Sequence, residues 1–193
     1  LMPQPDHIVK IDLPNTNTLD DDIQKYLQIC TENLGMVQNV LAAYTAKPKK
    51  FRQFTKVYNQ LMLDEQETQL SKLEREMIAV VVSSANRCYY CLVAHGQAVR
   101  ELSNDPQLGE MMVMNYKVAQ VSKRQKAMLD YAWKLTKAPF EIDDSDRDAL
   151  RQAGFNDGDI FDITDVVGFF NYTNRMAHGL DMMPNAEYHS MSR

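Results

Sequence analysis

The chain has 193 residues, of which 45% are hydrophobic and 24% are charged, and it carries a formal net charge of −5 at pH 7. A chain of this length and composition fits one globular domain with its own core. The net negative charge gives no electrostatic reason to bind nucleic acid or anionic lipid, and no apolar run approaches the roughly 20 residues that span a bilayer. We therefore expect a single domain over residues 1–193, without nucleic-acid or membrane partners.

The sequence contains three cysteines, Cys30, Cys88 and Cys91. So few cysteines do not make a disulfide framework, and the N-terminus lacks the basic start and apolar stretch of a secretory signal. These features indicate a cytoplasmic protein in which the position of each cysteine needs its own explanation. We interpret Cys30 as a small core residue.

The spacing of apolar residues predicts an all-α fold, because they recur every three or four positions and glycine and proline are scarce, with seven residues of each. A first helix is expected from near Asp20, where three consecutive aspartates can cap a helix and complement its dipole, to near Gly35. Two further helices are expected over 36–45 and 51–63. A turn at Pro48 separates them, since proline disrupts a helix interior.

A capping-box pattern at Ser71 and Glu74 predicts the start of a long central helix. The polar stretch 83–86 offers side chains that compete for backbone hydrogen bonds, so we place a break there and a new helix over 87–102. The buried face of the first of these helices is expected to carry Leu73, Met77, Val80 and Val81. Later helices are expected over 107–120, 122–137, 144–152 and 159–177. The chain ends, about 1–18 and 185–193, are expected to be poorly ordered.

The most informative motif is Cys88-Tyr89-Tyr90-Cys91, followed four residues later by His95. Positions i, i+3 and i+7 lie on one face of a helix, so both thiols and the imidazole are expected on a common stripe. Residues three apart on a helix have Cα atoms about 5 Å from each other, within the range of a disulfide. The pair is therefore expected to open and close.

A working thiol needs activation, because a free cysteine with a pKa of about 8.5 is only about 3% thiolate at pH 7. His95, one turn beyond Cys91, is the expected base for that thiol, whereas the helix N-terminus favours Cys88. Glu76 would lie about 18 Å from Cys88 on one straight helix. If the chain folds back at the predicted break, the Glu76 carboxylate can reach the same pocket and orient His95.

The spacing from Glu76 through Cys88 and Cys91 to His95 resembles the signature of AhpD-like alkylhydroperoxidases, within the carboxymuconolactone decarboxylase-like superfamily. The flanking sequence from Gly35 to about residue 187 resembles the shorter, peroxidase-related branch. The resemblance implies an AhpD-like helix bundle with the Cys-x-x-Cys at the start of a central helix, assembled as a homo-trimer or homo-hexamer.

The resemblance also implies an activity, namely thiol-dependent reduction of alkyl hydroperoxides or hydrogen peroxide in antioxidant defence, without a cofactor. Cys91 would be the peroxidatic thiolate, Cys88 the resolving thiol, His95 the base and Glu76 its partner in a proton relay. An external dithiol, either a lipoyl protein or a thioredoxin-like partner, would reduce the disulfide. The chain departs from the best-known AhpD pattern at Tyr90, where that pattern has a histidine.

Other interpretations are less well supported by the sequence. A zinc site would use Cys88, Cys91, His95 and Glu76 as ligands, but structural zinc usually draws a second ligand pair from elsewhere. A thioredoxin-like fold would need strands before the motif, and a c-type haem site would need a histidine directly after Cys91. We interpret the remaining histidines as structural, and the polar and aromatic run 169–175 as a subunit interface or an ordinary amphipathic surface.

Overall fold

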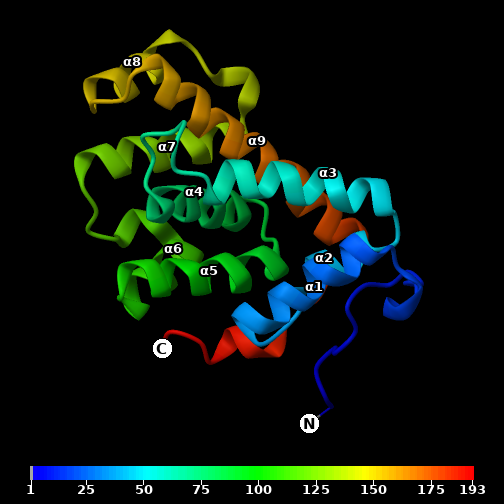
Figure 1. Cartoon of the computed structure of the whole chain (residues 1–193). Helices are drawn as coiled ribbons and strands as arrows, with labels where there is room; N and C mark the ends of the chain where they lie inside the picture. Colours follow the sequence, from blue (N-terminus) through cyan, green and yellow to red (C-terminus); the bar gives the residue numbers. More distant parts are fainter. Residues whose placement is uncertain (1) are drawn as a thin grey trace.

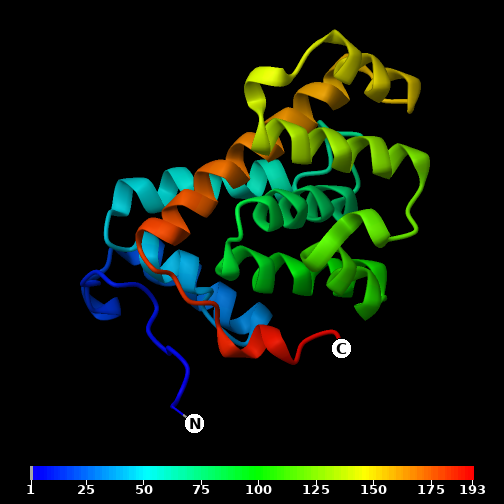
Figure 2. The ribbon, with the colours of Figure 1, turned by 180° about the vertical axis from the view of Figure 1, so that it is seen from behind.

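The expected helices form, and the residues that the computed structural model describes, 2–193, contain no β-strand. None of the helices in this part of the chain combines the length and apolarity needed to cross a bilayer. The α-helices are α1 Asp21–Leu34, α2 Asn39–Tyr44, α3 Pro48–Tyr58, α4 Lys72–Ala85, α5 Tyr89–Ser103, α6 Pro106–Asn115, α7 Lys123–Lys137, α8 Asp144–Gln152 and α9 Asp157–Gly179. Helices α1 to α3 lie at one end and α6 to α8 at the other, and α9 runs between the two ends (Figure 1 and Figure 2).

Helix α4 forms the centre of the fold and packs against α5, α6, α7 and α9. Each residue from Met77 to Val82 has 0% of its surface exposed. We expected one buried face, but α4 is buried all round because this uninterrupted apolar run covers every side of the helix. Each large side chain buried in this way contributes about 1.5–3 kcal/mol to stability. Helix α4 is therefore closely packed on all sides, and this packing holds its side chains in fixed positions.

Two predicted helix ends are confirmed in detail. The Ser71 hydroxyl accepts from the Glu74 amide at 3.1 Å, and the Glu74 carboxylate accepts from the Ser71 amide at 3.0 Å, which completes the capping box of α4. Gly35 ends α1 in the left-handed conformation with φ of 73°, which glycine adopts without steric cost. Local sequence therefore determines where these two helices begin and end.

Other boundaries differ from the prediction. Helix α3 begins at Pro48 rather than at 51, because proline fits the first helical position, where no amide hydrogen is needed. Helix α6 ends at Asn115, whose side chain accepts from the Lys117 amide and so competes with the helical hydrogen bonds. Asp20 does precede α1, but its carboxylate binds Arg52 instead of capping the helix.

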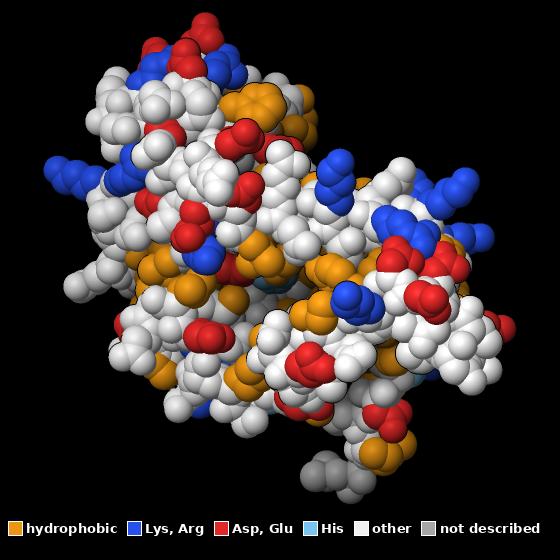
Figure 3. Space-filling view, in the orientation of Figure 1, with side chains coloured by type: hydrophobic (Ala, Val, Ile, Leu, Met, Phe, Trp, Pro, Cys, Tyr) orange, Lys and Arg blue, Asp and Glu red, His pale blue; other side chains and the backbone are white. Residues whose placement is uncertain are grey.

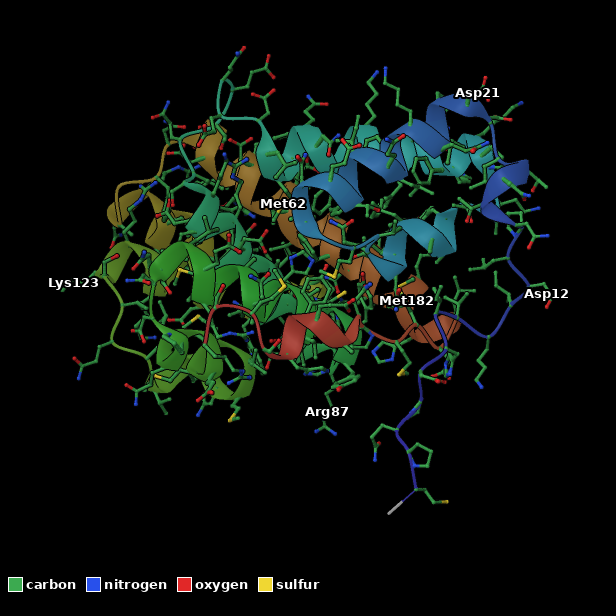
Figure 4. All side chains as sticks on the ribbon, turned by 60° about the horizontal axis from the view of Figure 1, so that its bottom comes forward. Asp12, Asp21, Met62, Arg87, Lys123 and Met182 are labelled. Atoms are coloured by element: carbon green, nitrogen blue, oxygen red, sulfur yellow. The ribbon has the colours of Figure 1, made fainter. Side chains whose placement is uncertain are left out.

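The turn between α4 and α5 positions the motif. Arg87 adopts a left-handed backbone conformation with φ of 54°, and its side chain points away from the body into solvent (Figure 4). The Cys88 amide then donates to the Ser83 carbonyl at 2.9 Å. Cys88 is thus the N-cap of α5, with extended backbone, and not a residue within the helix as we expected. This turn folds α5 back along α4.

Both chain ends contact the helical body. The Lys10 amide donates to the Leu180 carbonyl at 2.8 Å, and the Met183 amide donates to the Ile8 carbonyl at 3.0 Å. A short 3₁₀ turn, Ala186–His189, packs on α5 and leaves Tyr188 only 8% exposed. Residues 8–10 and 183–189 are therefore placed against the fold, whereas the poor order expected for the chain ends stays a prediction.

Candidate active site

The fold brings Glu76 and His95 together. Glu76 lies on α4 and His95 on α5, and the Glu76 Oε2 atom is 2.6 Å from His95 Nδ1. Their side chains are only 9% and 13% exposed. The geometric expectation that a fold-back at the break would bring Glu76 to His95 is confirmed. Because the carboxylate binds Nδ1, it fixes the orientation of the ring. The other ring nitrogen, Nε2, is left to exchange a proton with a ligand.

The two cysteines lie at the buried N-terminus of α5. Cys88 is 1% exposed and Cys91 is 3% exposed, and both are free thiols. The two thiols lie close enough for each to influence the ionisation of the other. Within residues 2–193, the hydrogen bond of His95 goes to Glu76 and not to either thiol.

The two thiols titrate as one coupled pair. The hydrogen bond from the Cys91 thiol is the main cause that lowers the pKa of Cys88, to about 7. The hydrogen bond with Cys88, followed by burial, raises the pKa of Cys91 well above its usual value. The pair therefore loses its first proton near neutral pH and retains the second, so that two sulfur atoms share one negative charge.

A largely apolar cavity of about 480 Å³ opens beside this pair. Cys91, His95 and Glu76 line it, whereas Cys88 does not. Its other walls come from α1, α3, α9 and the C-terminal segment, and hydrophobic side chains gather around a hollow near the centre of the face in Figure 3. A molecule entering the cavity therefore meets Cys91 and not Cys88.

Cys30 and Tyr90 also belong to the cavity wall. Cys30 is half-buried and packs at the edge of the hydrophobic core, but it also lines the cavity, which we did not expect. Tyr90 occupies the position where the best-known AhpD pattern has a histidine, and it is 4% exposed. Its hydroxyl accepts from the Val40 amide at 3.0 Å and so ties α5 to α2. Burial is the main cause that raises the pKa of Tyr90 well above its usual value.

Sequence reasoning missed three residues around the site. Phe170 was assigned to an interface or a surface, but it is 1% exposed and its ring meets that of His95 edge-on, with centroids 4.7 Å apart. Asn174 is also fully buried, and its side chain donates to the Ser83 hydroxyl at 3.0 Å. Part of this arrangement could be predicted from spacing, because Phe170 and Asn174 are four residues apart and therefore share one face of α9.

The arrangement of donor side chains does not favour the zinc interpretation. In the described chain, residues 2–193, no group of three or more histidine, cysteine, aspartate or glutamate side chains is placed so that it can hold a metal ion. The Glu76 carboxylate is hydrogen-bonded to the Nδ1 atom of His95, and Cys88 does not line the cavity. The four residues are therefore arranged as a hydrogen-bonded Glu76–His95 pair and a pair of thiols that titrate together, rather than as a tetrahedral set.

Comparison with known proteins identifies the relatives of the chain. The carboxymuconolactone decarboxylase family matches residues 48–113. A solved structure of an uncharacterized peroxidase-related protein from Silicibacter sp. TM1040 is 60% identical, covers 100% of both chains and has a TM-score of 0.95. An uncharacterized peroxidase-related protein from Ralstonia eutropha JMP134, described as an alkylhydroperoxidase AhpD core, is 39% identical over 98% of both chains, with a TM-score of 0.93.

More distant structures share the fold alone. A variant of the debrominase Bmp8 in complex with 2,3,4-tribromopyrrole is 13% identical, covers 96% of this chain and 95% of its own, and has a TM-score of 0.76. Among proteins of curated function, none matches the chain. The two closely similar structures share the fold over nearly the whole chain, and the family match covers the residues of α4 and α5 that carry the motif. The chain thus belongs to the carboxymuconolactone decarboxylase family, among its AhpD-like, peroxidase-related proteins.

Proposed function

We propose that this protein is a thiol-dependent peroxidase that reduces alkyl hydroperoxides or hydrogen peroxide through a Cys88/Cys91 dithiol–disulfide cycle. The observation that carries the proposal is that Cys91 and the hydrogen-bonded Glu76–His95 pair line one apolar cavity. A nucleophile and a proton-transfer group at one concave site are what peroxide cleavage requires. The names of the two closely similar structures support this reaction class.

The oxidative half of the cycle uses both sulfur atoms. The Cys91 thiolate attacks the terminal oxygen of the peroxide, the O–O bond breaks, and the alkoxide takes a proton and leaves as an alcohol. Cys91 is then a sulfenic acid. The Cys88 sulfur attacks the Cys91 sulfur, hydroxide leaves and takes a proton to become water, and a disulfide forms. Cys88 suits the resolving role because it touches Cys91 but does not line the cavity.

The Glu76–His95 pair supplies proton transfer. In this proposal His95 accepts the proton of the thiol pair and returns it to the leaving alkoxide through Nε2, while Glu76 holds the ring at Nδ1. Because no hydrogen bond joins His95 to a thiol among the described residues, the proton must pass through the substrate or a water molecule in the cavity. Tyr90 is held by Val40 and has no part in this relay.

The reductive half of the cycle needs an external dithiol, for which we propose a lipoyl protein or a thioredoxin-like partner. That dithiol becomes a disulfide as the two protein thiols are restored. We further propose that residues 1–193 form one domain, that the protein assembles as a homo-trimer or homo-hexamer, and that it acts in the cytoplasm in antioxidant defence. The single domain is supported by the two closely similar structures, which match nearly the whole chain, and the assembly and role are what the resemblance to AhpD-like proteins implies.

The deciding experiment is anaerobic mixing of fully reduced protein with one equivalent of cumene hydroperoxide, followed by peptide mass mapping. The proposal expects rapid formation of a Cys88–Cys91 disulfide, one equivalent of alcohol, and an unchanged Cys30. Thiols that remain unreacted would refute the proposed peroxidase activity. If zinc then co-purified and was lost in Cys88→Ser, the zinc-binding alternative would replace it.

A further inference from the structure

The C-terminal segment, residues 183–192, forms one wall of the cavity that contains the candidate nucleophile. Tyr188 and Met191 of this segment line the same cavity as Cys91 and His95. Tyr188 is only 8% exposed although it lies on a short 3₁₀ turn. The turn lies beside α5 in both Figure 1 and Figure 2. The size of the cavity on this side therefore depends on two side chains from outside the helical body.

The beginning of the segment is fastened to the start of α2. The Asn185 side chain donates to the Val37 carbonyl at 2.8 Å, and its Oδ1 atom accepts from the Asn39 amide at 2.7 Å. The Asn39 side chain in turn donates to the Met183 carbonyl at 2.7 Å. These hydrogen bonds hold the first part of the segment against α2.

The rest of the segment is fastened to α5 by Arg100. This arginine is only 6% exposed, and its Nη2 atom donates to the Tyr188 carbonyl at 2.9 Å and to the Met191 carbonyl at 3.0 Å. Gly109 on α6 leaves room for the arginine stem, because a Cβ atom there would lie 2.5 Å from Arg100 Cγ. Arg100 does not line the cavity. A buried guanidinium needs partners for its donors, and the carbonyls of the segment supply them.

We propose that residues 183–192 determine which molecules reach Cys91. Tyr188 and Met191 are the specificity-determining residues, and Arg100 is the positioning residue that holds them in the wall. At about 480 Å³ the cavity lies in the lower half of the usual range for small-molecule sites, so it suits compact organic hydroperoxides. The inference rests on the proposed function only in naming hydroperoxides, because access to the cysteine can be measured without them.

The test compares the addition of two uncharged reagents, N-ethylmaleimide and the bulkier N-(1-pyrenyl)maleimide, to Cys91 of the reduced protein, with peptide mapping. Both reagents attack the same thiolate, so the ratio of the two rates does not depend on its pKa. For Tyr188→Ala and Met191→Ala we expect the ratio of bulky to small reagent to rise at least about ten-fold, since one methylene group in an apolar pocket changes selectivity about 10- to 200-fold. Met191→Trp should lower the ratio.

Arg100→Lys tests the positioning role. Lysine keeps the charge but lacks the planar fork that donates to both carbonyls. We expect the ratio of bulky to small reagent to rise in this variant as well. Amide hydrogen exchange of residues 186–192 should become faster while that of α4 stays unchanged, which distinguishes a loosened segment from a loosened fold.

Glu187→Ala is the matched control. Glu187 lies on the same short turn, but it is exposed and does not line the cavity, so we expect the ratio of the wild type. An unchanged ratio in both Tyr188→Ala and Met191→Ala would overturn the inference. An equal rise for both reagents, together with faster reaction of Cys88, would also overturn it by showing general loosening. So would a Cys91 thiol that N-ethylmaleimide does not reach.

The two proposals fail separately in this experiment. A wild-type protein that does not consume cumene hydroperoxide, but whose variants show the expected ratios, would refute the proposed function alone. Peroxide consumption with unchanged ratios would refute the role of residues 183–192 alone.

Discussion

Replacement of Glu76 by glutamine removes one charge from the site and almost nothing else. Glutamine has nearly the size of glutamate, so α4 and the cavity wall should keep their shape. The lost interaction is the 2.6 Å contact with His95 Nδ1, between two side chains that are 9% and 13% exposed. A hydrogen bond of this charged type contributes about 1.5–3 kcal/mol. If it supports proton transfer, Glu76→Gln should slow oxidation of the thiol pair by roughly 10- to 150-fold.

The assay is a single turnover followed in a quenched-flow instrument. Reduced protein is mixed with excess cumene hydroperoxide, quenched with acid at set times, and the remaining Cys91 thiol is quantified by mass spectrometry. This design separates peroxide cleavage from the reductive steps and needs no knowledge of the physiological reductant. Thermal unfolding of the same samples shows whether the variant is folded.

Glu74→Gln is the matched control for this prediction. Glu74 lies on the same helix, is 8% exposed and pairs with Arg124 at 3.3 Å, but it does not line the cavity. Glutamine can also serve in its capping box. We expect this variant to oxidise at the wild-type rate. A Glu76→Gln variant that is folded and oxidises as fast as Glu74→Gln would refute the role that we assign to the Glu76–His95 pair.

Three further outcomes are expected. Because the pKa of Cys88 is lowered to about 7, the thiolate fraction should fall from about one half at pH 7 to about 1% at pH 5. Stopped-flow oxidation rates should therefore drop roughly fifty-fold as the pH falls, and a flat profile would contradict the coupled pair. Cys88→Ser should stop after one oxidation and leave a sulfenic acid on Cys91 that dimedone traps; a disulfide to Cys30 instead would show that another thiol resolves it. Tyr90→Phe loses the 3.0 Å hydrogen bond with the Val40 amide and should lower the free energy of unfolding in urea by about 1–3 kcal/mol; an unchanged unfolding midpoint would show that this bond adds no stability.

Sequence reasoning located the helices and singled out four candidate site residues because both depend on local spacing. The capping box at Ser71 and the left-handed Gly35 are properties of a few neighbouring residues, and both are confirmed. The approach of Glu76 to His95 could be anticipated as well, because the break after α4 leaves the following helix room to fold back along it. The catalytic roles assigned to these residues stay predictions.

Other features of the site depend on contacts between distant segments. Asn174 is 91 residues from Ser83 in the chain, and only the packing of α9 on α4 makes them neighbours. The N-cap position of Cys88 follows from the left-handed conformation of Arg87, and arginine gives no local signal for such a turn. The cavity likewise combines walls from both ends of the chain. No single stretch of sequence encodes these arrangements.

The full burial of α4 separates the parts of this enzyme candidate that can be engineered from those that cannot. A substitution between Met77 and Val82 would disturb the packing of four neighbouring helices at once, so altered selectivity there would come with loss of fold. Helix α1 offers the opposite situation. Ile29 and Leu34 border the cavity yet are 45% and 47% exposed, so larger or smaller side chains can be accommodated at its rim. Libraries that aim to change which molecules enter should therefore vary α1 and leave α4 untouched.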